Sequence, residues 1–209
     1  MAFDHLQRYI ARHLSHPGGL FGRFVLFGLN RVNARMIASA IEWSGLTAGE
    51  RFLDIGFGGG IGFSIAARRM RGEGTMIGVE PSATARQAAL RRYRRWVDAG
   101  FLHILEGDAA HLPLEDHSVE RIITVNTIYF WPDAAAGLAE IRRVLRPGGR
   151  FVLAVYTEEQ LRAISLTRFG YTIRSDDELR SLLRDAGFSL AGIRSARAYG
   201  HDYRGFIAE

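Results

Sequence analysis

The sequence predicts an α/β fold with a largely parallel sheet. From about residue 51 to residue 156, short apolar runs alternate with segments of helical periodicity, and helical segments of about 10 to 15 residues between strands are typical of strand–helix–strand units. A cluster of glycines, Gly56 to Gly60, follows the first apolar run and precedes the first of these helices. Such turns are typical of this fold class, because the chain must reverse sharply where a strand ends.

Seven short runs have the composition and length of strands. In chain order they cover residues 51–55, 75–79, 101–105, 119–125, 150–156, 189–197 and 203–208. The last two flank the turn sequence Tyr199-Gly200-His201-Asp202. We therefore expect a closing hairpin that adds antiparallel strands to one edge of the sheet.

Helical periodicity separates these runs and also fills the N-terminal part of the chain. The segments that we expect to be helical cover residues 4–16, 20–44, 61–71, 82–98, 133–145 and 176–186. Pro147-Gly148-Gly149 ends the fifth segment, and Ser175 stands in the N-cap position of the sixth. We divide this single domain into a helical N-terminal segment or lid, residues 1–46, and a core, residues 47–209.

Composition narrows the possible functions. The 209 residues carry a net charge of +5, the sequence pI is about 10.1, and 47% of the residues are hydrophobic, as in a globular domain. The chain contains neither cysteine nor lysine, which excludes disulfides, thiolate nucleophiles, Cys-ligated metals, lysine Schiff bases and P-loop chemistry. The start lacks the apolar region of a signal peptide, and residues 20–29 are too short to span a bilayer. We therefore expect a soluble, cytoplasmic protein.

The most informative segment has the form D-x-G-x-G-x-G. It runs from Asp54 through Gly56, Phe57 and Gly58 to Gly60. Glycines let the backbone approach a ligand closely, and ligands of open α/β sheets bind outside the carboxyl ends of the strands. The spacing does not fit the dinucleotide fingerprint G-x-G-x-x-G, which disfavours an NAD-dependent enzyme. An acidic residue at the strand end repels a pyrophosphate and favours a cationic ligand group.

Polar residues also follow the next three predicted strands. Glu80 ends the second strand, where a carboxylate can accept hydrogen bonds from the two hydroxyls of a ribose. Asp108 follows the third strand beside the small Ala109 and can accept a hydrogen bond from the exocyclic amine of a flat ring. Asn126 follows the fourth strand and precedes an aromatic-rich loop, residues 127–133, which is a candidate wall for a substrate.

These motifs resemble the class I S-adenosylmethionine-dependent methyltransferases, and among them the type 11 family, which is similar to the quinone C-methyltransferases. The matching segments are residues 53–60, 78–80, 107–109, 112–114, 119–131 and 145–150. The resemblance implies a Rossmann-like, seven-stranded sheet in the order 3-2-1-4-5-7-6, with strand seven antiparallel and helices on both faces. It also implies S-adenosyl-L-methionine as the cofactor and S-adenosyl-L-homocysteine as the product.

The residues to which the resemblance gives a role in cofactor binding share one feature, because each lies at or just after the end of a predicted strand. They are Asp54, Gly56 and Gly58 in the methionine pocket, Phe57 and Gly60 in the same loop, Glu80 at the ribose, Pro81 and Ser82 beside the adenosine, Asp108 and Ala109 at the adenine, and Asn126 near the methionine part. The resemblance says nothing about the acceptor.

Methyl transfer from a sulfonium is an in-line displacement with a neutral leaving group. The protein mainly needs to align the reacting atoms in a water-poor pocket. Phe57 and Tyr129 are candidates for aromatic faces beside the sulfonium. A general base is needed only for a poorly ionised acceptor, and His111, Tyr129 and His16 are candidates among which the sequence does not select.

We expect a small-molecule acceptor that is apolar or aromatic. In the family that the chain resembles, the segments before the first strand and after the fifth strand cover the substrate, and here these are residues 1–46 and 157–174. Four side chains of the first segment, His5, Tyr9, His13 and His16, lie near one helical face without an evident carboxylate partner. We therefore predict an amphipathic lid helix there and no metal site.

Two alternatives stay open beside the small-molecule enzyme. The basic pI and the cluster Arg91 to Trp96 prompt a nucleic-acid or protein methyltransferase. A solvated helix face explains that cluster better, and the sequence from Asn126 to Tyr129 differs from the Asn-Pro-Pro-Tyr loop of amino-directed DNA methyltransferases. The second alternative is a non-catalytic domain that binds the cofactor without turnover. We favour the small-molecule enzyme, without a nucleic-acid partner.

Overall fold

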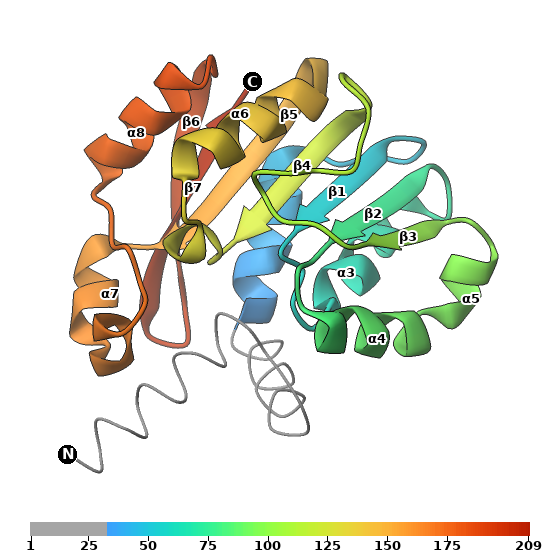
Figure 1. Ribbon diagram of the computed structural model, residues 1–209, viewed down its shortest axis with the longest axis horizontal. Coiled ribbons are helices and arrows are strands. Elements are labelled where there is room, and N and C mark those ends of the chain that lie inside the picture. Colours follow the sequence, from blue (N-terminus) through green and yellow to red (C-terminus); the bar gives the residue numbers. More distant parts are fainter. Residues whose placement is uncertain (1–32) are drawn as a thin grey trace.

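The computed structural model describes residues 33–209 and shows one seven-stranded sheet with helices on both faces (Figure 1). The strands are β1 Arg51–Ile55, β2 Thr75–Val79, β3 Leu102–Leu105, β4 Val119–Val125, β5 Leu145–Tyr156, β6 Leu190–Ala198 and β7 His201–Ala208. They lie in the order β3-β2-β1-β4-β5-β7-β6. β7 pairs antiparallel with β5 and β6, whereas the other neighbours pair in parallel. The predicted order and the reversed seventh strand are confirmed.

Helices cover the two faces of the sheet. They are α3 Ile61–Met70, α4 Ala83–Arg92, α5 Arg94–Asp98, α6 Ala134–Val144, α7 Glu158–Ala163 and α8 Asp176–Asp185, with short 3-10 turns η1 Ile128–Phe130 and η2 Ser165–Arg168. In Figure 1, α6 and α8 lie on one side of the sheet and α3, α4 and α5 on the other. Each face has its own cluster of buried apolar side chains, so the sheet is the middle layer of three.

Residues 33–44 form a helix that joins one of these two clusters. Met36, Ala40 and Ile41 are buried there beside Phe52 of β1 and Phe63 of α3. This helix ends where the sequence predicts. The predicted helix over residues 4–16, the first part of the one over residues 20–44, and the candidate base His16 lie outside the described residues.

The predicted helix over residues 82–98 is divided in two at Tyr93. This residue has φ −110° and ψ 22°, which are not helical, and α4 ends and α5 begins there. The break lets the Tyr93 side chain turn inward, where its hydroxyl donates to the Gly60 carbonyl at 2.8 Å and its ring stacks on Trp96. A side chain therefore links this helical layer to the glycine loop.

The helix α6 and the strand β5 follow each other without the gap that the sequence predicts. Leu145 pairs with Val119, the register then shifts, and regular pairing resumes at Arg150. The Pro-Gly-Gly segment lies in this shift, which is typical of a β-bulge. β5 therefore begins five residues earlier than predicted, at Leu145 instead of Arg150.

Local signals at the C-terminal end are confirmed. Ser175 caps α8 and forms a full capping box with Glu178. Tyr199 and Gly200 both have positive φ, 52° and 84°, as a two-residue hairpin turn of type I′ requires. This tight turn places His201 as the first residue of β7. Among the described residues, no helix is long and apolar enough to cross a membrane.

Candidate functional site

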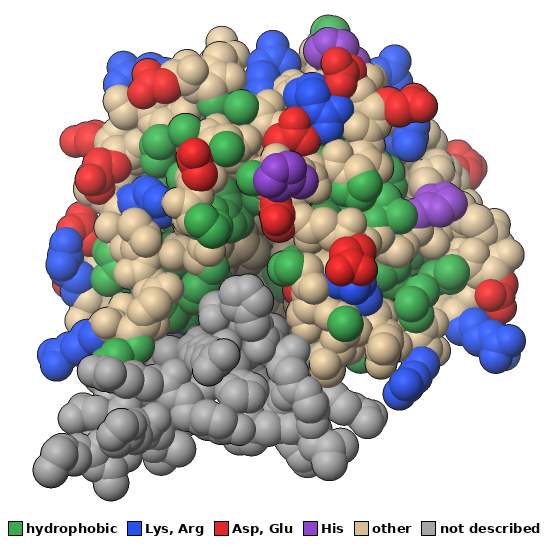
Figure 2. Space-filling model, viewed as in Figure 1, with side chains coloured by type: hydrophobic (Ala, Val, Ile, Leu, Met, Phe, Trp, Pro, Cys, Tyr) green, Lys and Arg blue, Asp and Glu red, His purple; other side chains and the backbone are tan. Residues whose placement is uncertain are grey.

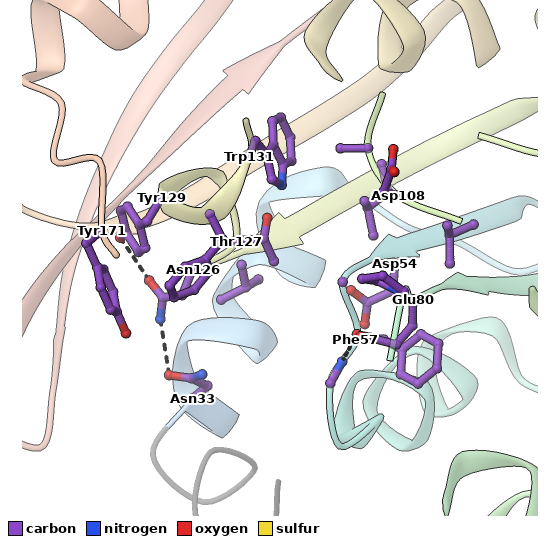
Figure 3. A pocket seen from close by; sticks show the side chains of 18 of the residues that line it. Asn33, Asp54, Phe57, Glu80, Asp108, Asn126, Thr127, Tyr129, Trp131 and Tyr171 are labelled. Atoms are coloured by element: carbon purple, nitrogen blue, oxygen red, sulfur yellow. Dashed lines mark hydrogen bonds between the residues drawn. The ribbon is translucent and has the colours of Figure 1, made fainter. Parts of the chain in front are cut away.

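A cavity of about 760 Å³ opens at the carboxyl ends of the central strands, which is where ligands bind in this class of sheet. Figure 3 shows that it has two differently lined ends, with Asp54 and Glu80 at one end and Tyr129 and Tyr171 at the other. Most of the predicted cofactor-binding residues line it. These are Asp54, Gly56, Phe57, Gly58, Glu80, Pro81, Asp108, Ala109 and Asn126. These residues, which the sequence analysis assigns to one site, therefore lie around one cavity in the structure.

The glycine loop is shaped by positive φ angles and by close neighbours. Gly56, Gly58 and Gly60 have φ of 70°, 53° and 70°, a region that other residues rarely adopt. A Cβ on Gly56 would lie 2.6 Å from the Thr127 Cγ2 atom, so no larger residue fits without a shift. The Gly56 amide donates to the Val79 carbonyl at 2.8 Å, which fastens the loop to the neighbouring strand.

Asp54 is buried at the end of β1, with 4% of its surface exposed. Its carboxylate lies over the first turn of α3, where a Cβ on Gly62 would come within 2.5 Å of Oδ2. Burial and, as the smaller cause, the negative charge of the nearby Glu80 together raise the pKa of Asp54 to about 7. An ionised Asp54 therefore lacks compensation from the described chain, and a cationic ligand group would supply it.

Glu80 is the second buried carboxylate, at the end of β2, and it connects two loops. Its Oε2 atom accepts a hydrogen bond from the Gly58 amide at 3.0 Å, and its Oε1 atom accepts one from the Ser82 amide at 2.9 Å. An ionised carboxylate has about four acceptor positions. Glu80 can therefore hold both loops while it faces a ligand in the cavity.

Two predicted site residues, Gly60 and Ser82, lie beside the cavity and do not line it. Gly60 is the N-cap of α3, and its carbonyl accepts the Tyr93 hydroxyl. Ser82 is the N-cap of α4, where its hydroxyl accepts the Ala85 amide. The structure thus gives both residues a supporting position behind the cavity wall.

The loop after β3 forms the rim of the carboxylate end. The Asp108 Oδ1 atom accepts hydrogen bonds from the amides of Ala110 at 2.8 Å and His111 at 3.0 Å, so its side chain shapes its own turn. Ala109 is buried, near the ring of Trp131 and Gly137 of α6. The His111 side chain is 87% exposed beside Asp108, which leaves this candidate base largely in solvent.

Phe57 lines the cavity but is held among core side chains. Its ring centroid lies 5.0 Å from that of Phe63, and the two rings lie against Gly78 of β2, where a Cβ would clash with both. The ring is buried. These contacts make Phe57 part of the floor beneath the glycine loop, and its predicted place beside a sulfonium stays a prediction.

Asn126 stands between the two ends of the cavity and belongs to a chain of hydrogen bonds (Figure 3). Its φ is 58°, a left-handed conformation that asparagine tolerates better than most residues. Its Nδ2 atom donates to Asn33 Oδ1 at 3.1 Å, and its Oδ1 atom accepts the Tyr129 hydroxyl at 3.1 Å. The Tyr156 amide in turn donates to the Tyr129 hydroxyl oxygen at 2.7 Å.

These bonds bear on Tyr129 as a candidate base. Burial raises the pKa of the Tyr129 hydroxyl well above its ordinary value. The hydroxyl also donates one hydrogen bond and accepts another. Tyr129 therefore fits the role of a fixed wall and a link between strands better than that of a base.

Sequence reasoning missed most of the aromatic end. The Tyr171 ring stacks on Tyr129 with centroids 5.6 Å apart and meets Phe130 at 4.5 Å. Further lining residues at or near this end are Asn33, Tyr156, Leu161, Ile164, Thr167 and His201. Several of them come from the segment 157–174, which the sequence indicates as a cover, but no motif singles them out. In the described part of the chain, no group of three or more acidic or histidine side chains is arranged to hold a metal ion.

Comparison with known proteins agrees with this geometry. Residues 53–153 match the Methyltransf_11 family model, described as a methyltransferase domain. The chain is 31% identical over 155 residues to an O-methyltransferase of Penicillium expansum, a match that covers 71% of this chain and 55% of that protein. It is 32% identical over 124 residues to the 2-phytyl-1,4-naphtoquinone methyltransferase of Synechococcus elongatus, with 59% and 52% covered. The chain spans about half the length of these curated relatives.

A solved structure shows the same fold over nearly the whole chain. It belongs to the complex between the Haloferax volcanii Trm112 methyltransferase activator and a putative methyltransferase. The TM-score is 0.75, the identity is 24%, and the match covers 88% of this chain and 92% of the other. The family match, the strand order and the cavity at the strand ends agree. Residues 53–153 therefore form a methyltransferase domain of the type 11 family within a sheet of the class I strand order, and S-adenosylmethionine is the cofactor of this family.

Proposed function

We propose that this chain transfers a methyl group from S-adenosylmethionine to a small-molecule acceptor. One observation carries the proposal: a single cavity joins a carboxylate-lined end to an aromatic end, with Asn126 between them. Its volume of about 760 Å³ lies within the range of small-molecule sites, roughly 300–1,000 Å³. The names of the two curated relatives, an O-methyltransferase and a naphtoquinone methyltransferase, support an acceptor of this kind.

The carboxylate end suits the hydrogen-bond donors of the cofactor. We assign Asp54 to the ammonium group of the methionine part, because its ionisation calls for a neighbouring positive charge. We assign Glu80 to the ribose hydroxyls and Asp108 with Ala109 to the adenine, and their position in the cavity lining supports this. We assign Asn126 to the neighbourhood of the methionine part. Gly56 and Gly58 leave the backbone open to close approach.

The protein contributes to this reaction mainly by aligning the reacting atoms, and less by forming bonds to them. When bound, S-adenosylmethionine supplies an electrophilic methyl group on a positively charged sulfur. The buried carboxylates favour that charge, and the rigid loop held by Glu80 fixes the ligand's position. The aromatic end, built by Phe130, Tyr129 and Tyr171, keeps water away from the acceptor. We keep residues 1–46 as the proposed lid and residues 47–209 as the catalytic core.

Calorimetric titration of the purified chain tests this proposal. S-adenosylmethionine, S-adenosylhomocysteine and NAD are titrated separately at neutral pH. We expect micromolar binding of the two sulfur compounds and none of NAD. Binding of NAD alone, or of neither sulfur compound, would overturn the proposal. A Glu73→Ala variant serves as a matched control, because this exposed carboxylate lies in the turn before β2 and should leave binding unchanged.

A further inference from the structure

His201 brings an imidazole to the aromatic end of the cavity. It is the first residue of β7, held there by the tight Tyr199-Gly200 turn, and it lines the cavity. The centroid of its ring lies 5.8 Å from that of the Tyr156 ring, in an edge-to-face arrangement. His201 is therefore fixed by the sheet on one side and open to the ligand space on the other.

The imidazole of His201 has a hydrogen-bonding capacity that the chain does not use. Its Nδ1 atom is buried and lacks a hydrogen-bond partner, and among the described side chains no other buried nitrogen or oxygen is in this state. A buried polar atom without a partner destabilises the folded state. Two hydroxyls of the cavity lining already have partners, since Tyr129 donates to Asn126 and Thr167 donates to the Leu161 carbonyl at 2.6 Å. A polar group of the acceptor would supply the missing partner.

Charge around the cavity limits what that acceptor can be. The carboxylates that line it are Asp54, Glu80, Asp108 and Asp133, and within residues 33–209 no arginine lines it. Figure 2 shows hydrophobic side chains gathered near the middle of the cavity-bearing face and arginines mostly toward its outline. A phosphate or carboxylate on the acceptor would thus find no cationic side chain among the described residues that line the cavity. The stacked rings of Tyr129 and Tyr171 suit a neutral, flat molecule.

We propose that His201 is the general base for O-methylation of a neutral aromatic hydroxyl compound. This proposal rests on the proposed function above. The acceptor oxygen forms a bond to the methyl carbon, the bond between that carbon and sulfur breaks, and its electron pair stays on the sulfur. The hydroxyl proton passes to the imidazole, so the products are a methyl ether, a neutral thioether and a protonated His201.

Two phenols of similar size and different acidity test this role. Wild-type chain with S-adenosylmethionine is assayed at pH 8 on 4-methylphenol, which is almost wholly protonated, and on 4-nitrophenol, which is largely ionised. Mass spectrometry detects the methyl ethers. We expect His201→Gln to lose about 100-fold or more in turnover of 4-methylphenol, as removal of a general base does, and less than about tenfold for the ionised phenol. A merely structural role would lower both rates equally.

Matched controls separate this inference from the proposed function. His103→Gln removes an exposed histidine on the far edge strand β3 and should leave both rates unchanged. His201→Gln should bind S-adenosylhomocysteine as wild type does, which shows that the variant is folded. Equal losses for the two phenols, or no loss, overturn the role of His201. A wild-type chain that binds the cofactor but methylates neither phenol overturns the inference alone, whereas absence of cofactor binding overturns both.

Discussion

The two ends of the cavity are built in different ways. At the carboxylate end, Asp54 lies near the end of β1 and Glu80 directly follows the adjacent parallel strand β2, and backbone amides of the following loops hold the Glu80 carboxylate. At the aromatic end, Asn33, Asn126 and Tyr171 come from a helix, a strand end and the loop before α8. The carboxylate end is thus a local product of two strand–turn–helix units, whereas the aromatic end exists only once distant segments have packed together.

The two ends of the cavity also differ in their electrostatics. At the carboxylate end, burial and the negative charge of Glu80 raise the pKa of Asp54, so the charge of this end depends on pH and on the ligand. The aromatic end is held by ring contacts and neutral hydrogen bonds. Substitutions at the first end should therefore change cofactor affinity and pH dependence, and substitutions at the second should change use of the acceptor.

The largest effect is expected from Asp54, through pH. Its pKa is raised to about 7 in the folded chain from an ordinary value of 3.8. The folded state therefore holds a proton that the unfolded state has lost, and stability falls as pH rises from about 4 to about 7. Each pKa unit of difference corresponds to about 1.36 kcal/mol, so the free energy of unfolding falls in total by on the order of 4 kcal/mol. Asp54→Asn should lack this loss.

Urea unfolding of wild type and Asp54→Asn at pH 5 and pH 8 measures that contribution. The variant should gain stability relative to wild type by about 3 kcal/mol between these two pH values, because most of the titration lies between them. Its affinity for S-adenosylhomocysteine should fall, since the ligand's ammonium group would lose the partner that we propose for it. Parallel pH profiles of the two proteins would show that Asp54 is not the group that titrates.

The next effect is expected from Glu80→Ala. The substitution removes the acceptor of the Gly58 and Ser82 amides. It also removes the charged group that we propose as the partner of the ribose hydroxyls. A hydrogen bond to a charged group contributes about 1.5–3 kcal/mol, so the loss of one such bond should lower the affinity for S-adenosylhomocysteine by roughly 10- to 150-fold. Calorimetry measures the change, with Glu73→Ala as the control. Affinity within a factor of two of wild type would remove Glu80 from the cofactor site.

Sequence alone predicts the carboxylate end well, for a physical reason. β1 and β2 are short apolar runs bounded by glycine and proline, and their predicted ranges, 51–55 and 75–79, agree with the structure. Because parallel strands end at one edge of the sheet, residues just after them meet without further assumptions. The assignments of Gly60 and Ser82 were less complete, since a strand-end position does not tell whether a residue faces the cavity or caps a helix.

The aromatic end could not be predicted in the same way. His201 lies in a sequence that indicates only a turn, and its place in the cavity depends on how β7 pairs with its neighbours. The partner of Asn126 is Asn33, 93 residues away, and no spacing rule joins two such positions. The break of the helix at Tyr93 is similar, because it accompanies a bond to the distant Gly60 carbonyl and no glycine or proline stands there.

A moderate effect is expected from Tyr129→Phe at the aromatic end. The ring stacking on Tyr171 remains, but the Tyr156 amide and the Asn126 side chain each lose a partner. We expect a loss of about 1–3 kcal/mol in the free energy of unfolding and a rise in KM for the acceptor with little change in cofactor affinity. Chemical denaturation measures the free energy of unfolding, steady-state kinetics the KM for the acceptor, and calorimetry the cofactor affinity. A large drop in cofactor affinity would contradict the separation of the two ends.

The smallest effect is expected far from both ends, at the arginines of α4 and α5. Arg91 and Arg95 are exposed. Tyr93, which lies between them in the sequence, and Trp96 pack inward and stack on each other. Stacking surfaces for bases are therefore not offered on the basic face, which leaves a solvated helix surface. Arg91→Gln/Arg95→Gln should change cofactor affinity and turnover by less than about twofold, because isolated surface charges contribute little. In about 50 mM salt, wild type should not retard short RNA or DNA in an electrophoretic mobility assay, although basic patches bind nucleic acid most strongly at such low salt. A shift in wild type that the double variant abolishes would instead assign the basic face to a nucleic-acid substrate.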